Sequence, residues 1–249
     1  TTVDGNVTDT TGSLTVDASA SAAAITFAAA AASIDANDAL KGGTGSSDVF
    51  QVTADSDSTG LVFGANVTGI ETVTVVAATT HDVKITTVDG NVTDTTGSLT
   101  VDASALTNTA AAMTFISQED STATINATGG AGADSFTAGV EKSNFSGGSG
   151  IDTFNFGDAH LTSADTVAGG AGVDILSMSA ASTQVDADFT NVTGVETLKQ
   201  ATGAQTTTLG SLADAAGIVT ITGTGAAADT VTVGAGFDNA LTVNLATGN

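Results

Sequence analysis

Three glycine-rich runs of one pattern constrain the fold of this chain more than any other feature. The pattern is Gly-Gly-x-Gly-x-Asp-x-Φ, where Φ is a large apolar residue, and its full copies begin at Gly129, Gly147 and Gly169. The first two copies start 18 residues apart, which corresponds to two nine-residue units. Short repeats of glycine and aspartate are typical of a chain that winds into a narrow parallel β-helix. The period therefore predicts a solenoid.

The apolar position of the nine-residue unit is kept even where the aspartate is lost. Five units in succession carry a large apolar residue there: Phe136, Phe145, Phe154, Val167 and Leu176. Because successive units alternate between two sides of a β-roll, each unit should stack on the one two places later. The pattern predicts that these side chains point inward and form the core of 129–177.

A longer repeat spans most of the chain. Residues 1–20 recur without a change at 86–105, and looser echoes follow each copy. Solenoids grow by such duplication, because each coil contacts only its neighbours. We therefore divide the chain into a first β-repeat unit at 1–85, a second at 86–205 that contains the repeats of 129–177, and a partial third at 206–249.

Local signals favour strands along almost the whole chain. Short runs rich in β-branched residues, several of them alternating, are separated by Gly, Asn and Asp. The clearest lie at 14–16, 71–76, 218–221, 231–233 and 241–245. Residues 20–32 have helix propensity, but the counterpart at 110–124 has lost most of its alanines, so we expect strand or loop in both. The sequence predicts an all-β parallel solenoid with little or no helix.

Charge excludes several classes of partner. The chain has 27 acidic residues and four basic ones, for a net charge of −23. Such a surface repels nucleic acid and anionic lipid, and it repels itself unless cations neutralise it. At 41% hydrophobic residues the chain is nevertheless able to fold. No apolar run reaches the roughly 18 residues of a membrane span, so we expect no membrane insertion. The chain starts within the repeat pattern without an initiator Met, which suggests a processed product or a segment of a longer protein.

The glycine-rich runs also predict a metal site. Glycine admits positive φ and can turn carbonyl oxygens inward, and the aspartate adds a carboxylate beside them. Two such turns stacked about 4.8 Å apart would surround a cation with oxygen ligands, an arrangement that suits Ca²⁺ better than Mg²⁺. We expect Asp134 to pair with Asp152, Asp152 to pair with Asp174, and Asp165 to be more isolated on the opposite side. The glycines expected to contribute are Gly130, Gly132, Gly148, Gly150, Gly170 and Gly172.

Three further aspartates lie in degenerate copies of the pattern. Asp48 follows a motif that is one residue too long, and Asp229 and Asp238 follow looser glycine runs. Each is a candidate calcium ligand, and each could equally belong to a plain turn. The alternative for the whole set is a glycine-turn β-helix whose aspartates are solvated and bind no metal.

The repeats, with the Thr/Ala/Val/Ser-rich sequence around them, resemble RTX calcium-binding proteins. The segments Leu-Thr-Val-Asp-Ala-Ser-Ala at 14–20 and 99–105 make the chain similar to RTX-type surface-layer proteins of bacteria, Caulobacter among them. The resemblance is specific at 129–177 and diffuse elsewhere. It implies type I secretion, calcium-triggered folding outside the cell, a place on the bacterial cell surface and assembly into a lattice.

No constellation of residues indicates catalysis. His81 and His160 are isolated, and no nucleophile elbow, zinc-protease motif or phosphate loop is present. We therefore expect a structural protein and not an enzyme, with calcium and copies of itself as partners and cell-surface polysaccharide as a further candidate. The alternative is a stalk segment of a large RTX adhesin. An accessory β-roll of an extracellular hydrolase would need a catalytic domain that this sequence does not contain.

Overall fold

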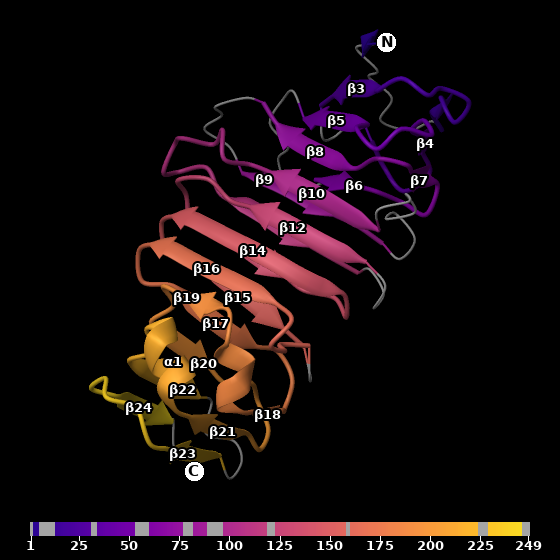
Figure 1. Ribbon diagram of the computed structural model, residues 1–249. Helices are drawn as coiled ribbons and strands as arrows, with labels where there is room; N and C mark the ends of the chain where they lie inside the picture. The colour runs from indigo at the N-terminus through magenta and orange to yellow at the C-terminus, as the bar shows by residue number, and fades with distance from the viewer. Residues whose placement is uncertain are drawn as a thin grey trace.

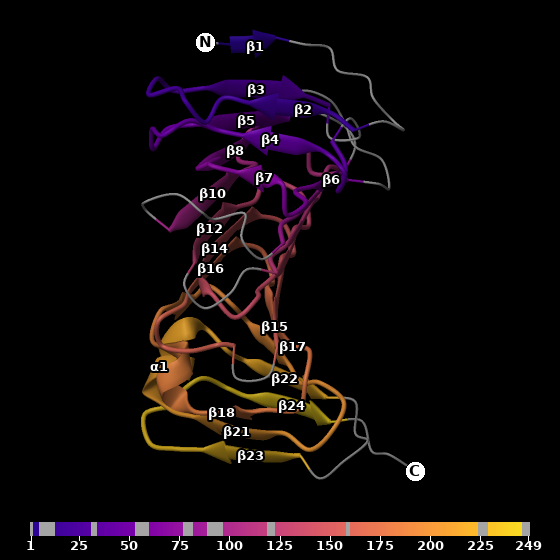
Figure 2. The same cartoon turned by 90° about the vertical axis from the view of Figure 1, so that its right-hand side faces the viewer.

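A parallel β-solenoid makes up the described part of this protein, as the sequence predicts (Figures 1 and 2). The computed structural model describes residues 2–4, 13–30, 34–52, 60–76, 82–88, 97–118, 123–157, 160–223 and 229–245. Coils follow one another from the N-terminal end to the C-terminal end, so the termini lie at opposite ends of the molecule (Figure 1).

Two nine-stranded parallel sheets form the main walls. The first main sheet contains, in spatial order, β1 (Thr2–Asp4), β3 (Thr26–Ala29), β5 (Val49–Val52), β8 (Thr72–Val75), β10 (Ser98–Asp102), β12 (Thr124–Thr128), β14 (Lys142–Ser149), β16 (Thr166–Ala171) and β19 (Val192–Thr193). The second main sheet contains β6 (Leu61–Val62), β9 (Val83–Thr86), β11 (Met113–Ile116), β13 (Ser135–Thr137), β15 (Thr153–Phe156), β17 (Ile175–Met178), β20 (Thr197–Lys199), β22 (Thr220–Gly223) and β24 (Thr242–Leu245).

Two three-stranded parallel sheets lie toward the ends of the solenoid. The N-terminal minor sheet contains β2 (Thr15–Asp17), β4 (Ala39–Lys41) and β7 (Val67–Thr68). The C-terminal minor sheet contains β18 (Thr183–Gln184), β21 (Thr206–Leu209) and β23 (Thr230–Val233). Near the C-terminal end, a 3₁₀ turn, η2 (Asp186–Phe189), and one short helix, α1 (Ser211–Ala216), pack against each other.

The nine-residue period holds for one coil and is relaxed in the next. Asp134 and Asp152 occupy equivalent positions 18 residues apart, whereas Asp152 and Asp174 are 22 residues apart. The register of the strands is unaffected, with Phe154 opposite Phe136 and Leu176 opposite Phe154. The additional residues are therefore accommodated outside the paired strands, which is where a solenoid tolerates insertions.

The predicted apolar position forms the core of the repeat region. Phe136, Phe145, Phe154, Val167 and Leu176 are all at most 1% exposed. The rings of Phe136 and Phe154 stack with centroids 5.1 Å apart within the second main sheet. Phe145 of the first main sheet lies 5.3 Å from Phe136, so the two walls interlock through aromatic side chains.

The sheets run without interruption through both expected unit boundaries. In the first main sheet β10 pairs directly with β8, and in the second β22 pairs directly with β20. Hydrogen-bonded stacking thus continues from the first sequence copy into the second, and from the second into the partial third.

Candidate metal centre

A column of acidic side chains joins successive coils along one edge of the second main sheet. Asp134, Asp152, Asp174 and Glu196 each immediately precede a strand, namely β13, β15, β17 and β20; we call these four the carboxylate ladder. The backbone N–H of Asp134 donates to Oδ1 of Asp152 over 2.7 Å, and that of Asp152 donates to Oδ1 of Asp174 over 2.8 Å. The N–H of Asp174 donates to Oε2 of Glu196 over 2.8 Å. The structure thus brings together the pairs that the sequence predicts.

The ladder is buried, and part of it lacks hydrogen-bond partners. Asp134, Asp152 and Asp174 are at most 1% exposed. Oδ2 of Asp134 accepts a bond of 2.6 Å from the N–H of Gly130. By contrast, Oδ2 of Asp152 and Oδ2 of Asp174 are buried with no hydrogen-bond partner among the described residues. Buried carboxylate oxygens without a donor are costly, so these two atoms favour either protonation of the carboxyl group or a bound cation.

The first glycine of each repeat packs directly against these oxygens. A Cβ on Gly147 would lie 2.1 Å from Oδ2 of Asp152 and 2.5 Å from the carbonyl oxygen of Gly169. A Cβ on Gly169 would lie 2.5 Å from Oδ2 of Asp174 and 1.8 Å from the carbonyl oxygen of Gly194. At each step a carboxylate oxygen and a carbonyl oxygen of the next coil therefore both occupy the place where a Cβ would lie, so only glycine fits there.

The expected positive φ occurs at four of the six candidate glycines. Gly148, Gly150, Gly170 and Gly172 have φ of 103°, 120°, 106° and 155°, which other residues rarely adopt. Gly130 and Gly132 are not among the glycines with positive φ. Close approach explains them instead, since a Cβ on Gly132 would lie 2.0 Å from the carbonyl oxygen of Ala111 and one on Gly130 would lie 2.4 Å from that of Leu106.

Burial opposes ionisation of the ladder. Desolvation raises the pKa of Asp152 to about 7, and the neighbouring carboxylates of Asp134 and Asp174 add to the shift. Desolvation likewise raises the pKa of Asp134 and of Asp174 above the ordinary value, against the lowering effect of their backbone hydrogen bonds. A divalent cation between the coils would favour the ionised forms.

Asp165 lies on the opposite edge, before β16 of the first main sheet. Its Oδ1 accepts the N–H of Ser143 over 2.8 Å, and its Oδ2 accepts the N–H and the hydroxyl of Thr162 over 2.8 and 3.0 Å. Both oxygens therefore have donors. Ser143 also links Asp165 to Glu141, whose Oε1 accepts bonds from the Ser143 hydroxyl and the Gly139 N–H. Sequence reasoning missed Glu141, which is 3% exposed, because it occupies a different position of its unit.

Asp48 occupies the same position in the first sequence copy as Asp134 does in the second. It accepts the N–H of Ile25 and of Gly43, both over 2.6 Å, and its own N–H donates to Oε2 of Glu71 over 2.5 Å. A Cβ on Gly42 would lie 1.6 Å from the carbonyl oxygen of Gly69 and 3.0 Å from Oδ2 of Asp48. The extra residue in this motif is taken up within the turn, and the geometry of the carboxylate is retained.

The two remaining candidates differ from each other. Asp229 precedes β23 and accepts the N–H of Gln205 over 3.0 Å, so it has the ladder geometry with an amide as its neighbour. Asp238 is exposed, and its backbone N–H donates to Oδ1 of Asp214 over 2.9 Å. The structure does not bring Asp238 together with another predicted ligand in the described part of the chain.

At each step of the ladder from Asp134 to Asp174, one carboxylate oxygen and one backbone carbonyl oxygen contact the same glycine. Within the described ranges, no group of three or more His, Cys, Asp or Glu side chains is placed to hold a metal ion. A cation at one step of the ladder would instead be bound by one carboxylate and one carbonyl of the next coil. These pairs are Asp134 with Gly147, Asp152 with Gly169, and Asp174 with Gly194. An all-oxygen set of carboxylates and carbonyls is the kind that Ca²⁺ prefers.

Of the two histidines, only His160 lies in the described part of the chain, and it is not one of the four ladder residues. His160 lies beside Gly157 in the turn before β16, and His81 lies outside the described residues. No described helix combines the length and hydrophobicity needed to cross a bilayer. The chain matches no family model, no curated protein and no solved structure.

Proposed function

We propose that this chain is a calcium-binding structural protein of the bacterial cell surface, which assembles with copies of itself outside the cell. The observation that carries the proposal is the carboxylate ladder, with Oδ2 of Asp152 and of Asp174 buried and without donors next to glycine carbonyls. Calcium would be held at the ladder by these oxygens. It would supply positive charge between coils whose carboxylates otherwise repel one another.

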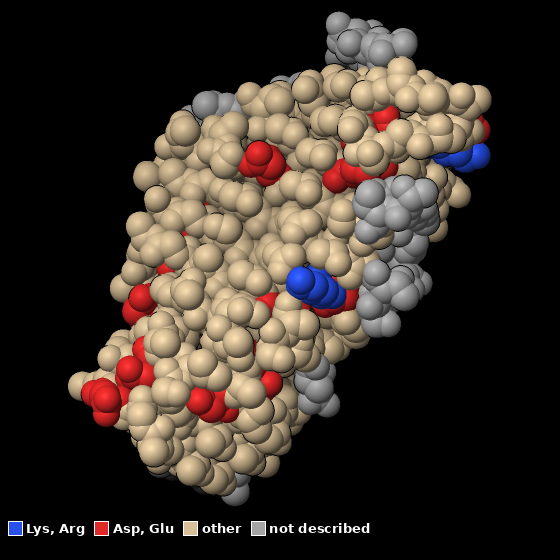
Figure 3. Space-filling model, viewed as in Figure 1, with Lys and Arg blue, Asp and Glu red and all other residues tan. Residues whose placement is uncertain are grey.

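The charge distribution supports a role for cations in folding. The net charge of −23 is large, yet Figure 3 shows a face that is mostly uncharged with a few scattered acidic patches. Part of the acidic charge is buried at Asp48, Asp134, Asp152, Asp165 and Asp174. Cation binding to the folded chain alone would contribute its binding free energy to folding. Because calcium is scarce in cytosol and abundant outside cells, folding would follow export.

Calorimetric titration with calcium, combined with far-ultraviolet circular dichroism, tests the proposal. Calcium should bind with measurable heat, and chelation should weaken the β signal. The double variant Asp152→Asn/Asp174→Asn keeps the side-chain shape and removes two charges, so its calcium affinity should fall at least about tenfold. Asp17→Asn is the matched control, since Asp17 is 47% exposed and lies away from the ladder.

Two results would count against the proposal. If calcium addition produces no heat and leaves the circular dichroism spectrum unchanged, calcium binding is not part of the function. Equal calcium affinities of the parent chain and the double variant would place the ion elsewhere. Negative-stain imaging of the same samples tests the assembly: ordered particles that appear with calcium support it, and a persistent monomer favours the adhesin stalk.

A further inference from the structure

The two minor sheets each end in a strand with one unpaired edge. β2 is the outer strand of the N-terminal minor sheet, and β23 is the outer strand of the C-terminal minor sheet. Within the described ranges, β2 pairs only with β4, and β23 pairs only with β21. Figure 2 shows β2 near one end of the solenoid and β23 at the other. Unpaired strand edges are sites where further strands add.

The sequence of β2 also occurs in the interior of the molecule. Residues 13–17 and 98–102 are both Ser-Leu-Thr-Val-Asp, and the second copy is β10, which lies between β8 and β12. Leu99 and Val101 of β10 are 1% and 0% exposed. The identical Leu14 and Val16 remain half-buried. The same residues are thus fully buried when a strand covers the edge that β2 leaves open.

The strand that covers this edge in the interior has a near-copy at β23. Residues 71–75, which include β8, are Glu-Thr-Val-Thr-Val, and residues 229–233, which include β23, are Asp-Thr-Val-Thr-Val. Glu71 and Asp229, which precede β8 and β23, make the same kind of hydrogen bond to the preceding coil. Glu71 accepts the N–H of Asp48 one coil earlier, and Asp229 accepts the N–H of Gln205 one coil earlier.

The apolar faces of these two strands differ only in being covered. Val73 and Val75 of β8 are 0% and 1% exposed, whereas Val233 of β23 is 52% exposed. In β23, Val231 lies opposite Thr207 and Val233 lies opposite Leu209, both fully buried, so its valines continue an inward-facing column. The column ends at β23 in the described chain, with apolar surface left in solvent.

The free edges of β2 and β23 face the directions needed to pair as β10 and β8 do inside the molecule. β8 presents to β10 the edge that faces later coils, and the free edge of β23 is the same one because β21 covers the other. β10 receives β8 on the edge that faces earlier coils, and β2 leaves that edge open because β4 covers the other.

We propose that copies of this chain stack head to tail, with β2 of one copy adding in parallel to β23 of the next. The pairing of β10 with β8 inside the molecule gives the expected register between β2 and β23. Thr100 lies opposite Thr72, Val101 opposite Val73 and Asp102 opposite Thr74, so Thr15 would lie opposite Thr230, Val16 opposite Val231 and Asp17 opposite Thr232. The inference rests on the self-assembly in the proposed function and specifies the surface that performs it.

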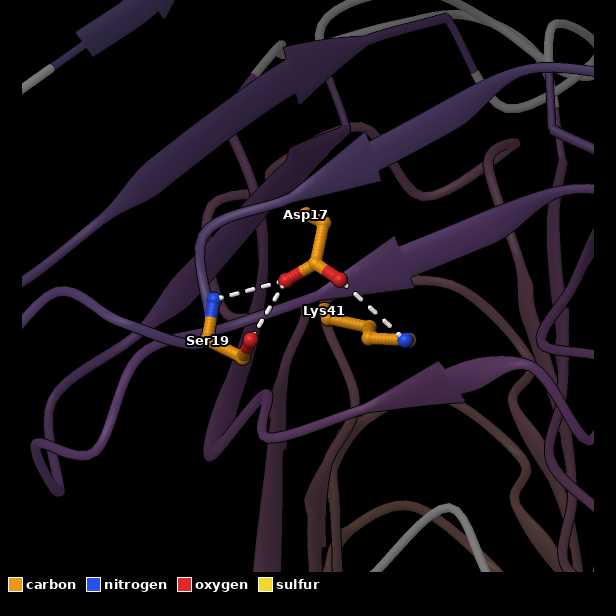
Figure 4. A network of polar contacts seen from close by, with 3 residues as sticks. All are labelled: Asp17, Ser19 and Lys41. Carbon is orange, nitrogen blue, oxygen red and sulfur yellow. Dashed lines mark hydrogen bonds and ion pairs between the residues drawn. The ribbon is translucent and has the colours of Figure 1, made fainter.

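β2 already has the local structure that the junction needs. Oδ1 of Asp17 accepts the N–H of Ser19 over 3.0 Å, and Oδ2 lies 3.2 Å from Nζ of Lys41 in β4 (Figure 4). In the interior copy, Oδ1 of Asp102 accepts the N–H of Ser104 over 2.9 Å. The turn after the strand therefore has the same hydrogen bond in both copies. β2 is held in place by β4, and no described strand pairs with its other edge.

Because the two edges belong to different ends, the contact does not close upon itself. A heterologous contact of this kind generates an open filament in which each added copy again presents β23. The chain contains no cysteine, so introduced cysteines can report the register without background.

Disulfide cross-linking of the full chain in calcium tests the register. Cα atoms directly opposite each other in paired strands lie within disulfide range, and those displaced by two residues do not. A mixture of Thr15→Cys and Thr230→Cys chains should give cross-linked dimers at least about tenfold more often than Thr15→Cys with Thr232→Cys. Equal yields from both mixtures would overturn the proposed register.

A proline variant tests the edge itself. The N–H groups of Thr230 and Gly234 donate to β21, so the intervening Val231 N–H points to the free edge. Val231→Pro should remove this donor, leave the circular dichroism of the monomer unchanged, and weaken self-association at least about tenfold. Val231→Thr keeps the N–H and a similar shape, and it should associate like the parent chain.

The outcomes separate this junction from the proposed function. Calcium-dependent assembly that persists in Val231→Pro, without in-register cross-links, overturns the β2–β23 junction and leaves the calcium-binding structural role intact. A parent chain that binds calcium but stays monomeric at all concentrations overturns the junction together with self-assembly. A parent chain that neither binds calcium nor assembles overturns the proposed function as well.

Discussion

At the scale of single residues, the aspartates of the ladder connect coils through both the side chain and the backbone. Asp152 donates its N–H to Asp174 and accepts the N–H of Asp134, so one residue joins three coils. Its second carboxylate oxygen has no donor among the described residues. The hydrogen bonds to the backbone stabilise the fold, whereas burying the negative charge of Asp152 is costly. The net effect depends on whether the carboxyl group is protonated or bound to a cation.

In calcium-free protein, the free energy of unfolding should fall as the pH rises from about 4 toward 7. The pKa of Asp152 is raised from 3.8 to about 7 by burial, so the folded chain binds more protons than the unfolded chain across this window. Stability from this group is full below the unfolded pKa and is lost as the pH passes the folded pKa. Urea unfolding in chelator at pH 5 and pH 7.5 measures the effect.

The control for this pH dependence is Asp152→Asn, which cannot ionise. It should flatten much of the slope, with the rest due to Asp134 and Asp174, whose pKa values are raised for the same reason. Greater stability of the calcium-free parent at pH 7.5 than at pH 5 would contradict the expectation.

Gly147→Ala should destabilise the protein by about 1–3 kcal/mol, because the added Cβ would meet Oδ2 of Asp152 and the carbonyl of Gly169. Calcium binding should weaken as well, since the methyl group would displace the carboxylate and carbonyl oxygens that are the proposed ligands. Gly45→Ala is the matched control. Its Cβ would lie 3.7 Å from the carbonyl oxygen of Ala22 in ordinary contact, so thermal unfolding should change little.

At the scale of the elements, the strands are short and gain stability from the stacking of like residues in adjacent coils. Phe115, Phe136 and Phe154 lie opposite one another in β11, β13 and β15, and all are fully buried. The sequence predicts Phe136 and Phe154 of this column from the apolar position of the repeat, and the structure adds Phe115. The sequence does not predict α1, which begins after Gly210 and ends at Gly217 with φ of 103°.

Phe136→Ala should cost about 3–5 kcal/mol of unfolding free energy, because it opens a cavity between the rings of Phe145 and Phe154. Ile151 is the comparison residue, since it lies in the adjoining glycine turn and is 58% exposed. Ile151→Ala should change the unfolding midpoint by little. Similar losses in both variants would mean that the aromatic column is not the main core of the repeat region.

At the scale of the whole molecule, the described strands pair with those of adjacent coils, and stability should vary along the axis. Interior strands such as β13 and β15 pair on both edges, whereas β2 and β23 pair on one in the described chain. Solenoids of this type approach a sum of coil stabilities and nearest-neighbour terms. Because each coil is stabilised by the coils next to it, the strands β2 and β23 at the two ends each have one edge without a partner in the described chain.

Hydrogen exchange in dilute calcium-loaded protein should reveal a gradient along the axis. Amides of β12 to β17 should exchange most slowly, and those of β2, β23 and β24 should exchange fastest. Raising the protein concentration should slow exchange in β2 and β23 selectively if copies stack through these edges. Uniform protection along the chain would indicate a single cooperative unit and contradict the gradient.

The sequence by itself determined the fold class and the pairing of Asp134, Asp152 and Asp174, because a short period places like residues in register whatever the loops do. Tertiary structure decided which degenerate motifs share this geometry. Asp48 has it despite a motif of the wrong length, and Asp238 lacks it, because the path of each turn depends on the coil against which it packs. Only the tertiary structure could show that identical residues at 13–17 and 98–102 lie in different sheets, one at an open edge and one between two strands. Position along the axis, which no local sequence encodes, sets whether a neighbouring strand is present.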